Sequence, residues 1–551
     1  MLSNICSHLF KRFKVEGFSP GPVITNYAID FTNDRIKLSL PKDFISNKKL
    51  ELDSIKNFKS DNIIQNIEIK SKDFVLEVNK NIFIEDVLKV PNLKEILRYN
   101  EKLVVDFSSP NIAKPFHLGN LRSTIIGNFI SNLNTYLGNS VTRLNYLGDW
   151  GTQFGFLNVG LDILNLQNEE LAKDPINLLY KAYVTAHNLS KTNPEIVDKA
   201  RNIFSDLENG KDLERWKLLK EFTTNELELT YNRLGVKFDH YDWESMYGSQ
   251  KFQTVVDVLK TNDLLKTDYQ GRQIIEFGDR NIPILKSDQS SLYISRDILA
   301  AIDRYERFKF DRMLYVVDNS QTDHFDSLKF IIKQMNFDWF DRIGHVKFGR
   351  VRGMSTRKGS AVFLNDILDE AKDLMLKKQI ESSTTKVSIN NSEITDSLGI
   401  SCVIINDLKQ RRQRDYEFNW EKVLQVKGDS GSKLQYTHCR LYSLLNNNSN
   451  IKLPEKCDPE ILSSNIEALN LIIHLSKFYS ILHKSHLEME ACILVNYLFI
   501  LCNLISRALK VLRVKNEQPS IASQRLLLFY ISKHVLYDGM VILGLKPLNE
   551  M

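Results

Sequence analysis

The feature that most constrains the fold is a buried strand, a helix and a second buried strand in close succession. Residues 102–109, KLVVDFSS, form a run of apolar and β-branched residues that ends in two serines. Residues 141–151, VTRLNYLGDWG, form a second such run and end in a glycine-punctuated turn. Between them, apolar residues recur at helical spacing until Gly138, at Leu121, Ile125, Phe129, Leu133 and Leu137. This order predicts a βαβ unit and therefore a parallel sheet.

The rest of the chain divides into three regions by its pattern. Residues 1–95 mix short alternating runs with Lys- and Asn-rich connections, which predicts a small N-terminal α+β domain. Within residues 96–380, the stretch 312–320, RMLYVVDNS, again has the pattern of a buried strand, after a mostly helical stretch at about 155–280. We therefore expect 96–380 to form one α/β domain of the Rossmann type, with 155–280 as an insertion between its two halves. Residues 381–551 show amphipathic helical periodicity, which predicts an all-α C-terminal bundle.

Composition fits a soluble protein of several domains and leaves the function open. Of the 551 residues, 43% are hydrophobic and 26% are charged. Lys and Arg total 73 against 68 acidic residues, and a net charge of +5 only mildly favours an anionic partner such as nucleic acid. The six cysteines are scattered without a CxxC pair, which favours a reduced compartment and no structural zinc.

Two apolar stretches bear on membranes and targeting. Residues 491–505 form the longest apolar run, which is shorter than a membrane span and contains Asn496 and Asn503. We expect a buried core helix there and no membrane association. Residues 1–18 are apolar and basic, with their first acid at Glu16. An ordinary amphipathic helix explains this composition at least as well as a weak organelle-targeting segment does.

The turn between the first buried strand and its helix is where a ligand is expected. In an open parallel sheet, ligands bind beyond the carboxyl ends of the strands, and a helix N-terminus attracts phosphate. Gly119 lets a ligand approach the backbone, His117 can hydrogen-bond a phosphate, and Lys114 adds a positive charge. Taken singly, these residues fit a structural histidine better than a binding site.

The longer string carries more information. Residues 106–129, DFSSPNIAKPFHLGNLRSTIIGNF, closely resemble the signature of arginyl-tRNA synthetases, class I enzymes whose adenylate site carries a four-residue motif written HIGH. Further similar strings follow in order, namely NYLGDWGTQFG, SLYISRDILAAIDRYE, GMSTRKGSAVFL and LQYTHCRL. The resemblance runs from roughly residue 100 to residue 551 and is strongest to the eukaryotic branch, which includes mitochondrial forms.

The resemblance implies an arginine–tRNA ligase with a Rossmann-type catalytic domain. L-arginine and ATP would form arginyl-adenylate, and the arginyl group would then pass to the 3′ end of tRNA(Arg). Catalysis would rest on positioning and charge stabilisation rather than on a protein nucleophile. Mg²⁺ would accompany ATP as part of the substrate complex, with no structural metal held by the protein. Members of this family are usually monomers.

The resemblance assigns catalysis and ATP binding to two short segments. The catalytic residues it implies are Lys114, His117, Gly119, Asn120, Arg357 and Lys358. The ATP-binding residues it implies are His117, Gly119, Asn120, His324, Met354 and Ser355.

This chain departs from the general class I pattern in both segments. Asn120 replaces the second His of the motif, and an Asn keeps an N–H donor but carries no charge. We therefore expect a slowed or compensated enzyme rather than an inactive one. GMSTR, residues 353–357, replaces the lysine-rich KMSKS loop. Lys114 would substitute for one loop lysine, while Arg357 and Lys358 are either phosphate clamps or solvated loop charges.

The arginine side chain needs carboxylates, because a guanidinium presents five donors in a planar fork. Glu244 and Asp297 match the two guanidinium-binding acids of the family, and Tyr293 matches a substrate-contacting tyrosine. If the resemblance is set aside, the sequence pattern alone favours Asp297 as a surface residue that pairs with a Lys or Arg one helical turn away. The resemblance adds further arginine-binding residues, namely Ser109, Asn111, Gln153 and Gln321.

The resemblance places tRNA contacts at both ends of the chain. Residues 381–551 would bind the anticodon, and residues 1–95 would contact the tRNA elbow. Tyr436 is the candidate for stacking on a base, with Arg440 on the same helical face, and a buried core tyrosine is an equally good interpretation. Met551 matches a position near the anticodon.

Two other functions remain open at this point. The chain could be a synthetase-derived RNA-binding protein whose adenylation is reduced or lost through Asn120 and the altered loop. It could also be a class I synthetase for another amino acid, but a neutral substrate would leave Glu244 and Asp297 unpaired. From the basic start, the absence of a long N-terminal extension and the small N-terminal domain, we expect the mitochondrial matrix, with the cytoplasm as the alternative.

Overall fold

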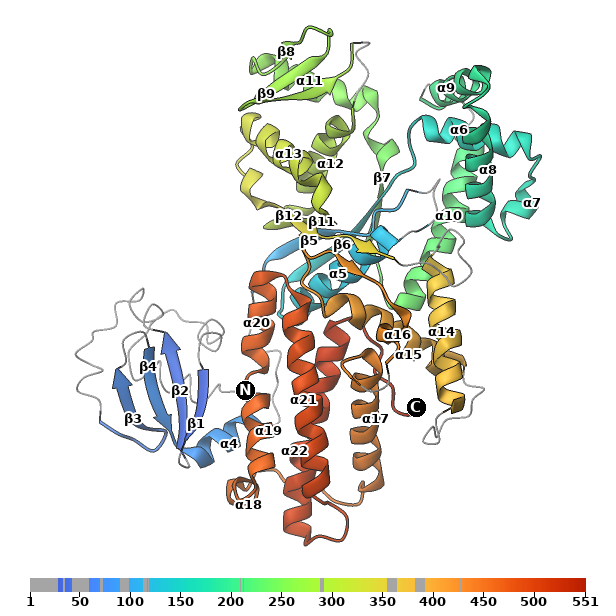
Figure 1. Cartoon of the computed structure of the whole chain (residues 1–551). Coiled ribbons are helices and arrows are strands. Elements are labelled where there is room, and N and C mark those ends of the chain that lie inside the picture. Colours follow the sequence, from blue (N-terminus) through green and yellow to red (C-terminus); the bar gives the residue numbers. More distant parts are fainter. Residues whose placement is uncertain are drawn as a thin grey trace.

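The computed structural model describes residues 28–32, 35–41, 59–69, 73–89, 99–111, 116, 118–208, 210–211, 213–287, 292–353, 364–381, 392–425 and 428–551. Its centre is a five-stranded parallel sheet in the order β12-β11-β5-β6-β7 (Figure 1). The strands are β5 (Lys102–Asp106), β6 (Ser140–Leu147), β7 (His240–Trp243), β11 (Arg312–Asp318) and β12 (Ile343–Phe348). On one side of β5 the sheet continues with β6 and then β7. On the other side it continues with β11 and then β12, so the strand order reverses between β5 and β11.

The predicted strand–helix–strand unit is confirmed. α5 (Leu118–Tyr136) connects β5 to β6, and Leu121, Ile125, Phe129 and Leu133 of this helix are buried. Gly138 follows the helix with a φ of 93°, the left-handed conformation expected of a helix C-cap. The predicted buried strand at 312–320 is also present as β11: α12 (Tyr293–Phe308) leads into it, and α13 (Thr322–Gln334) connects it to β12.

Two units rise from the carboxyl edge of the sheet (Figure 1). One is helical and consists of α6 (Thr152–Ile163), α7 (Asn168–Leu171), α8 (Pro175–Leu189), α9 (Pro194–Glu208) and α10 (Leu213–Leu234). The other combines α11 (Ser249–Thr261) with a small antiparallel sheet of β8 (Lys266–Thr267), β9 (Gln273–Phe277) and β10 (Arg280–Leu285).

The expected insertion at 155–280 differs from the structure in one respect. β7 lies inside this range, yet it pairs in parallel with β6 and is an edge strand of the central sheet. Its four residues, HYDW, are too few and too polar to show the apolar run by which the other strands were recognised.

The N-terminal region contains a four-stranded antiparallel sheet, which fits the expected α+β domain. The elements are β1 (Ala28–Thr32), β2 (Arg35–Pro41), β3 (Ile64–Ile69), β4 (Asp73–Val78) and α4 (Lys80–Leu88). β2, β3 and β4 coincide with the alternating runs in the sequence. α4 packs against helices of the C-terminal bundle, so the small domain is joined to the end of the molecule opposite the two raised units (Figure 1).

The C-terminal third is helical, as predicted. Its elements are α15 (Ser392–Leu408), α16 (Trp420–Val423), α17 (Gly431–Asn447), α18 (Pro459–Ser463), α19 (Ile466–Ser476), α20 (Phe478–Glu488), α21 (Ala491–Val511) and α22 (Pro519–Ile542), preceded by α14 (Leu364–Glu381). A short parallel pair, β13 (Val351–Arg352) with β14 (Tyr416–Glu417), joins the segment after β12 to this bundle.

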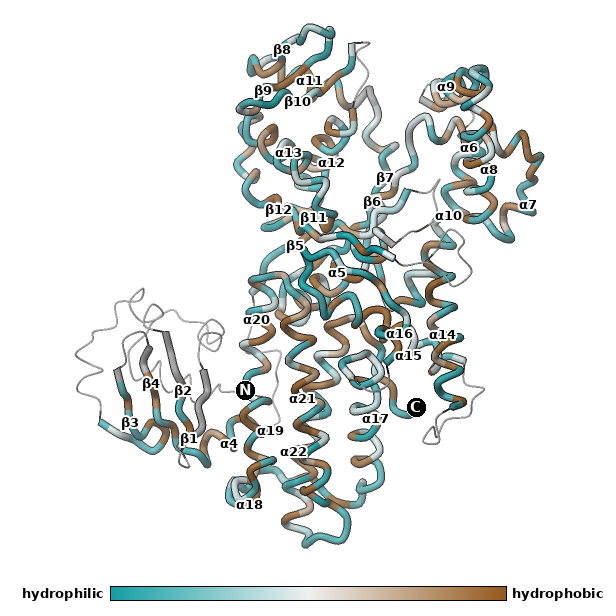
Figure 2. Tube along the Cα trace, in the orientation of Figure 1, coloured by the Kyte–Doolittle hydropathy of each residue, from teal (hydrophilic) through white to brown (hydrophobic). Residues whose placement is uncertain are grey.

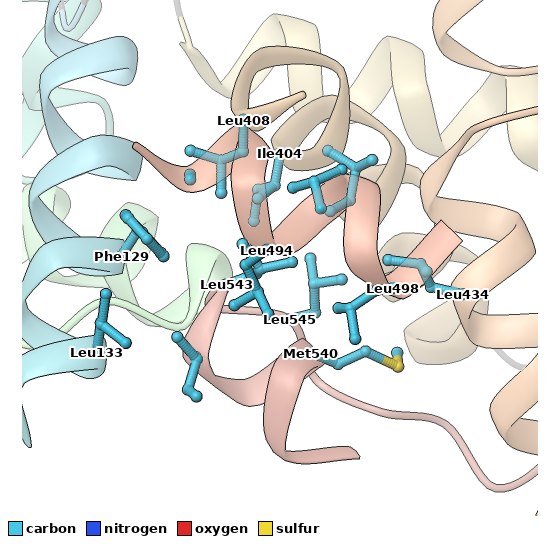
Figure 3. Close-up of a cluster of buried hydrophobic side chains, with 14 of the residues drawn as sticks. Phe129, Leu133, Ile404, Leu408, Leu434, Leu494, Leu498, Met540, Leu543 and Leu545 are labelled. Atoms are coloured by element: carbon cyan, nitrogen blue, oxygen red, sulfur yellow. The ribbon is translucent and has the colours of Figure 1, made fainter. Parts of the chain in front are cut away.

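One hydrophobic core extends from the helix beneath the sheet into the bundle. Figure 3 shows Phe129 and Leu133 of α5 beside leucines of α21 and residues after α22. Hydrophobic residues run along α21 and α22 (Figure 2). α21 is the helix of the described residues that is long and apolar enough to cross a membrane by length and composition. Most of its apolar side chains are buried in this core, so the expected core helix is confirmed.

Candidate active site

Most of the predicted arginine-binding residues follow the strands of the central sheet. Ser109 and Asn111 come after β5, Gln153 after β6, Glu244 directly after β7 and Gln321 after β11. The carboxyl ends of parallel strands meet at one edge, so residues distant in sequence are gathered there. The boundary between β5 and β11 is the switch point at which open sheets of this kind bind ligands.

The turn after β5 has an unusual backbone conformation. Ser108 and Ser109 have φ angles of 75° and 44°, in the left-handed region, which costs about 1–3 kcal/mol for each residue other than glycine. The Ser108 N–H donates to Ser123 Oγ at 2.9 Å, and the Ser109 N–H donates to Asn145 Oδ1 at 3.0 Å. The Ser109 hydroxyl donates to Asp106 Oδ1 at 2.9 Å. These contacts hold a strained turn in one geometry, which is typical of a substrate-binding segment.

Asn120 connects this turn to the start of α5. Its side-chain amide donates to the carbonyl oxygen of Ser108 at 3.1 Å. The Thr124 hydroxyl lies 2.6 Å from the Asn120 carbonyl oxygen and 2.8 Å from Ser108 Oγ. A neutral amide is sufficient for the contact with Ser108, because a carbonyl acceptor needs a donor and not a positive charge. Gly119 is exposed beside Asn120 in the first turn of the helix, where an anion is favoured.

Two acidic side chains, Glu244 and Asp297, come from different elements of this edge. Glu244 begins the short 3₁₀ helix η2 (Glu244–Tyr247), and Asp297 lies near the start of α12. Arg296 Nη1 lies 3.4 Å from Glu244 Oε2. Burial raises the pKa of Glu244 to about 7; the charges of Asp297 and Asp149 raise it as well, and Arg296 opposes them. Because the charge of Asp297 acts on Glu244, a cation bound beside Glu244 would be attracted by both carboxylates.

α12 also positions the predicted tyrosine. The helix begins at Tyr293, so Tyr293 and Asp297 lie one turn apart on the same face, as the spacing predicts. The Tyr293 side chain is 66% exposed, with the Arg296 guanidinium 5.6 Å from its ring centroid. His324, which we expect at ATP, lies in α13 with Nε2 only 2.5 Å from Asp297 Oδ2. His324 therefore contacts one of the two acids that we expect to bind the guanidinium. Gln321 is exposed at the end of the short 3₁₀ helix η3 (Asn319–Gln321), which follows β11.

The segment after β6 is fixed by a buried acid that sequence reasoning missed. Asp149 is fully buried and accepts hydrogen bonds from the Ser245 N–H at 2.9 Å and the Ser245 hydroxyl at 2.6 Å. Lys220 Nζ of α10 lies 3.0 Å from Asp149 Oδ2. Gln153, in the first turn of α6, donates to the carbonyl oxygen of Trp150 at 3.2 Å. Asp149 thus ties together β6, the segment after β7 and the helical unit.

A second residue missed by sequence reasoning is Arg304 of α12. It is 1% exposed, with its guanidinium 3.0 Å from Asp106 of β5 and 3.1 Å from Asp242 of β7. It also lies 3.4 Å from the Tyr315 hydroxyl of β11 and 4.7 Å from the Tyr146 ring centroid of β6. Burial raises the pKa of Asp106 to about 6, and Arg304 opposes that shift. Arg304 anchors the helix that carries Asp297 to four strands of the sheet.

Part of the predicted site lies outside the described residues. These positions are Lys114, His117, Met354, Ser355, Arg357 and Lys358. The structure does place Arg122 of α5, which is buried and donates to the carbonyl oxygens of Gly349 and Arg414. Arg122 Nε also lies 3.2 Å from Asp407 Oδ2 of α15. α5 is therefore tied both to the segment after β12 and to the bundle.

The candidate tRNA residues lie on α17. Tyr436 is 50% exposed, so the interpretation of it as a buried core tyrosine is wrong. The Arg440 guanidinium lies 5.6 Å from the Tyr436 ring centroid, on the same helix face as expected. The final segment is held against α17 by Gln435, which donates to the Lys546 carbonyl oxygen and accepts from the Leu548 N–H, and by His438, whose Nδ1 lies 2.7 Å from the Leu548 carbonyl oxygen. Met551 packs partly buried against the hydrophobic core.

Comparisons with known proteins decide the family. The model of the class I tRNA synthetase (R) catalytic domain matches residues 82–420, and that of the DALR anticodon-binding domain matches residues 434–551. The probable mitochondrial arginine–tRNA ligase of Bos taurus is 37% identical over 466 residues, which cover 82% of this chain and 78% of that protein. The chain belongs to the class I arginine–tRNA ligases.

Other members of this family are similar to a comparable degree. The cytoplasmic arginine–tRNA ligase of Saccharomyces cerevisiae is 39% identical over 469 residues, covering 82% of this chain and 77% of that protein. The crystal structure of the arginyl-tRNA synthetase of Plasmodium falciparum superposes with a TM-score of 0.73 at 26% identity, covering 100% of this chain and 98% of that one. The predicted fold class is thereby confirmed, and relatives from two compartments resemble this arginine–tRNA ligase equally.

Proposed function

We infer that this chain is an ATP-dependent arginine–tRNA ligase. It activates L-arginine to arginyl-adenylate and transfers the arginyl group to the 3′ end of tRNA(Arg) for protein synthesis. The matched family models and the curated relatives support this function. The structural observation that best supports arginine as the substrate is the pair Glu244 and Asp297 at the carboxyl edge of the sheet. Arg296 faces one oxygen of Glu244 and His324 one oxygen of Asp297, so a neutral substrate would leave the remaining acceptor oxygens of both partly buried acids without a donor.

For arginine binding we propose a division between the two ends of the substrate. Glu244 and Asp297 accept from the guanidinium, and Tyr293 covers it from the start of α12. Ser109, Asn111, Gln153 and Gln321 hold the amino and carboxylate groups. The support is the position of these residues in the fold. Ser109, Asn111, Gln153, Gln321 and Glu244 follow strands of the central sheet, while Tyr293 and Asp297 lie at the start of α12, which leads into β11. The strained turn at Ser108 and Ser109 fixes the position of Ser109.

For adenylation we propose that the start of α5 binds ATP. Gly119 and the helix N-terminus face the phosphates, and Asn120 fixes the preceding turn by its hydrogen bond to Ser108. His117, Lys114, Met354, Ser355, Arg357, Lys358 and His324 complete the ATP site in this proposal. Catalysis consists of positioning the carboxylate of arginine against the α-phosphate and stabilising the charge that develops there.

Mg²⁺ enters this proposal with ATP. In the described part of the chain, no group of three or more His, Cys, Asp or Glu side chains could hold a metal ion. Mg²⁺ keeps several waters and binds substrate phosphates readily, so we propose that the phosphates of ATP carry it into the site.

For tRNA we propose that three regions of the chain have different roles, namely anticodon binding, contact with the tRNA elbow and catalysis. Residues 381–551 bind the anticodon, with Tyr436 stacking on a base and Arg440 and Met551 beside it. Residues 1–95 contact the tRNA elbow. Residues 96–380, which include the insertion at about 155–280, form the catalytic domain that carries out adenylation and transfer to the tRNA. The match of the DALR anticodon-binding domain to residues 434–551 and the exposure of Tyr436 support this division.

We also propose a monomer in the mitochondrial matrix, with the cytoplasm as the alternative compartment. Similarity to mitochondrial relatives and the basic, apolar composition of residues 1–18 support the matrix. The similar cytoplasmic relative supports the alternative. Cell fractionation decides between the compartments, and light scattering on the purified protein gives its oligomeric state.

The experiment that tests the function is tRNA charging. Purified full-length protein, ATP, Mg²⁺ and radiolabelled arginine should yield arginyl-tRNA from tRNA(Arg) and none from a tRNA of another specificity. Absence of charging, with tRNA binding retained, would favour the synthetase-derived RNA-binding protein.

A further inference from the structure

Tyr146 carries a buried hydroxyl that the described structure leaves without a partner. The residue lies on β6, and its hydroxyl oxygen makes no hydrogen bond with any described residue. Buried tyrosine hydroxyls normally find a partner, because an unsatisfied polar group loses its water and receives nothing in return. A group of this kind is either a defect of the core or a contact reserved for a ligand.

The position of Tyr146 favours a ligand. In the parallel register Tyr146 is paired with Asp242 of β7, two residues before Glu244. After burial, the largest influences on the Tyr146 hydroxyl are the charges of Asp297 and then Glu244, which raise its pKa. The hydroxyl therefore lies within electrostatic reach of both acids of the arginine pocket.

The ring of Tyr146 is held on two sides. The Arg304 guanidinium lies 4.7 Å from the ring centroid, and the Tyr247 ring meets it edge-on at 6.1 Å. Both neighbours are themselves fixed, Arg304 by Asp106 and Asp242 and the Tyr247 hydroxyl by Asp303 at 2.8 Å. The hydroxyl is thus held in place before any substrate arrives.

The chemistry of a guanidinium leaves room for a third group. It has five N–H donors, and a bidentate contact with a carboxylate uses two of them. One oxygen of Asp297 is already bonded to His324, and one oxygen of Glu244 faces Arg296. A bidentate contact with each of the two acids uses four of the five donors, and a phenol oxygen can accept the remaining N–H and donate its own proton to a neighbouring acid.

We propose that the Tyr146 hydroxyl is a third guanidinium-binding group of the arginine pocket, next to Glu244 and Asp297. The inference rests on the proposed arginine–tRNA ligase function and adds a specificity-determining residue to it. A substrate without a guanidinium leaves this hydroxyl unpaired in a buried site, so Tyr146 contributes to the rejection of other amino acids.

The test compares the full-length wild type with Tyr146→Phe, which keeps the ring and removes only the hydroxyl. Arginine affinity is measured by calorimetry on the free protein, and the arginine and ATP KM values by tRNA charging. We expect the variant to bind arginine about tenfold more weakly, as for loss of a hydrogen bond to a charged group. Its KM for ATP should stay unchanged and its Tm unchanged or higher, because an unsatisfied buried group has been removed.

A second ligand and a control variant locate the effect. Agmatine, which keeps the guanidinium and lacks the carboxylate, should lose affinity for Tyr146→Phe by the same factor as arginine. Tyr305→Phe removes a hydroxyl from a ring that stacks on Trp339 at 4.7 Å, on the same helix as Asp297, and should leave both affinities unchanged.

Unchanged arginine affinity in Tyr146→Phe overturns the inference, and so does an effect on arginine that agmatine does not share. A wild type that charges no tRNA refutes the proposed function separately. The calorimetric comparison still decides the role of Tyr146 in that case, because it does not depend on turnover.

Discussion

His324 of α13 and Asp297 of α12 are joined by a hydrogen bond of 2.5 Å between Nε2 and Oδ2. The carboxylate that we assign to the substrate guanidinium is thus oriented by a neighbouring helix before arginine binds. Charge-assisted hydrogen bonds are short and strong, so this contact fixes the rotamer of Asp297. Preorganisation of this kind reduces the ordering cost that substrate binding would otherwise carry.

The first prediction concerns the charge of Asp297. Asp297→Asn keeps the size of the side chain and removes its charge, so we expect the arginine KM to rise by a factor of about 10²–10³, as for loss of a buried charge pair. The KM for ATP should change little, and steady-state tRNA charging measures both. Glu306→Gln is the matched control, because Glu306 lies on the same helix and is exposed. Equal effects of Asp297→Asn on both substrates would contradict the assignment.

The second prediction is a pH dependence of arginine binding. The pKa of Glu244 in the ligand-free protein is about 7, above its ordinary value of 4.5. As the pH falls through 7, Glu244 takes up a proton and no longer offers a charged acceptor. The arginine Kd should therefore rise roughly tenfold per pH unit below 7 and level off above 8.

Calorimetry also measures the proton linked to that binding. Arginine binding at pH 6.5 should release a proton, which titrations in two buffers of different ionisation enthalpy detect. A Kd that is constant from pH 8 to pH 6, with no proton release, would rule out this role for Glu244.

The third prediction concerns Asn120. Its amide donates to the Ser108 carbonyl at 3.1 Å, and a net contribution of about 0.5–1.5 kcal/mol is typical of such a bond. Asn120→Ala should slow adenylation by a factor of about 2–10, measured by single-turnover kinetics with tRNA present. Asn120→His restores the residue of the class I motif and should change the rate only modestly. If the wild type is inactive and Asn120→His is active, Asn120 marks a lost activity and not a compensated one.

The fourth prediction concerns stability. Arg304 pairs with Asp106 and Asp242 in the interior, so Arg304→Met leaves two buried carboxylates without this partner. We expect the free energy of unfolding to fall by about 3–5 kcal/mol, measured by urea denaturation. Arg307→Met serves as the control, because Arg307 is partly exposed and should contribute about 1 kcal/mol or less. Similar losses in both variants would show that Arg304 is not the anchor of α12.

The central βαβ unit and the helical last third were predictable because their signals are local. Apolar residues at helical spacing in α5 and the apolar runs of β5, β6 and β11 reflect burial, which each segment carries in its own sequence. β7 was missed because its four residues owe their place in the sheet to pairing with β6, and pairing leaves no local trace in HYDW.

The residues of the candidate site also fall into those that the sequence could reveal and those that it could not. Glu244 and Asp297 were found through a resemblance, and their positions at the edge of the sheet fit it. Arg304 and Asp149 were missed because a charged residue in an amphipathic helix or a glycine-rich turn is usually exposed to solvent, and the sequence alone gives no sign that these two are buried. Only the fold reveals that Arg304 is 1% exposed and Asp149 fully buried.

The measurement that tests the account most directly is amino-acid-dependent exchange of pyrophosphate into ATP in the presence of tRNA(Arg). The account predicts exchange with arginine, none with lysine or any uncharged amino acid, and a large loss in Asp297→Asn. No exchange with arginine from a folded protein that binds tRNA(Arg) would contradict it.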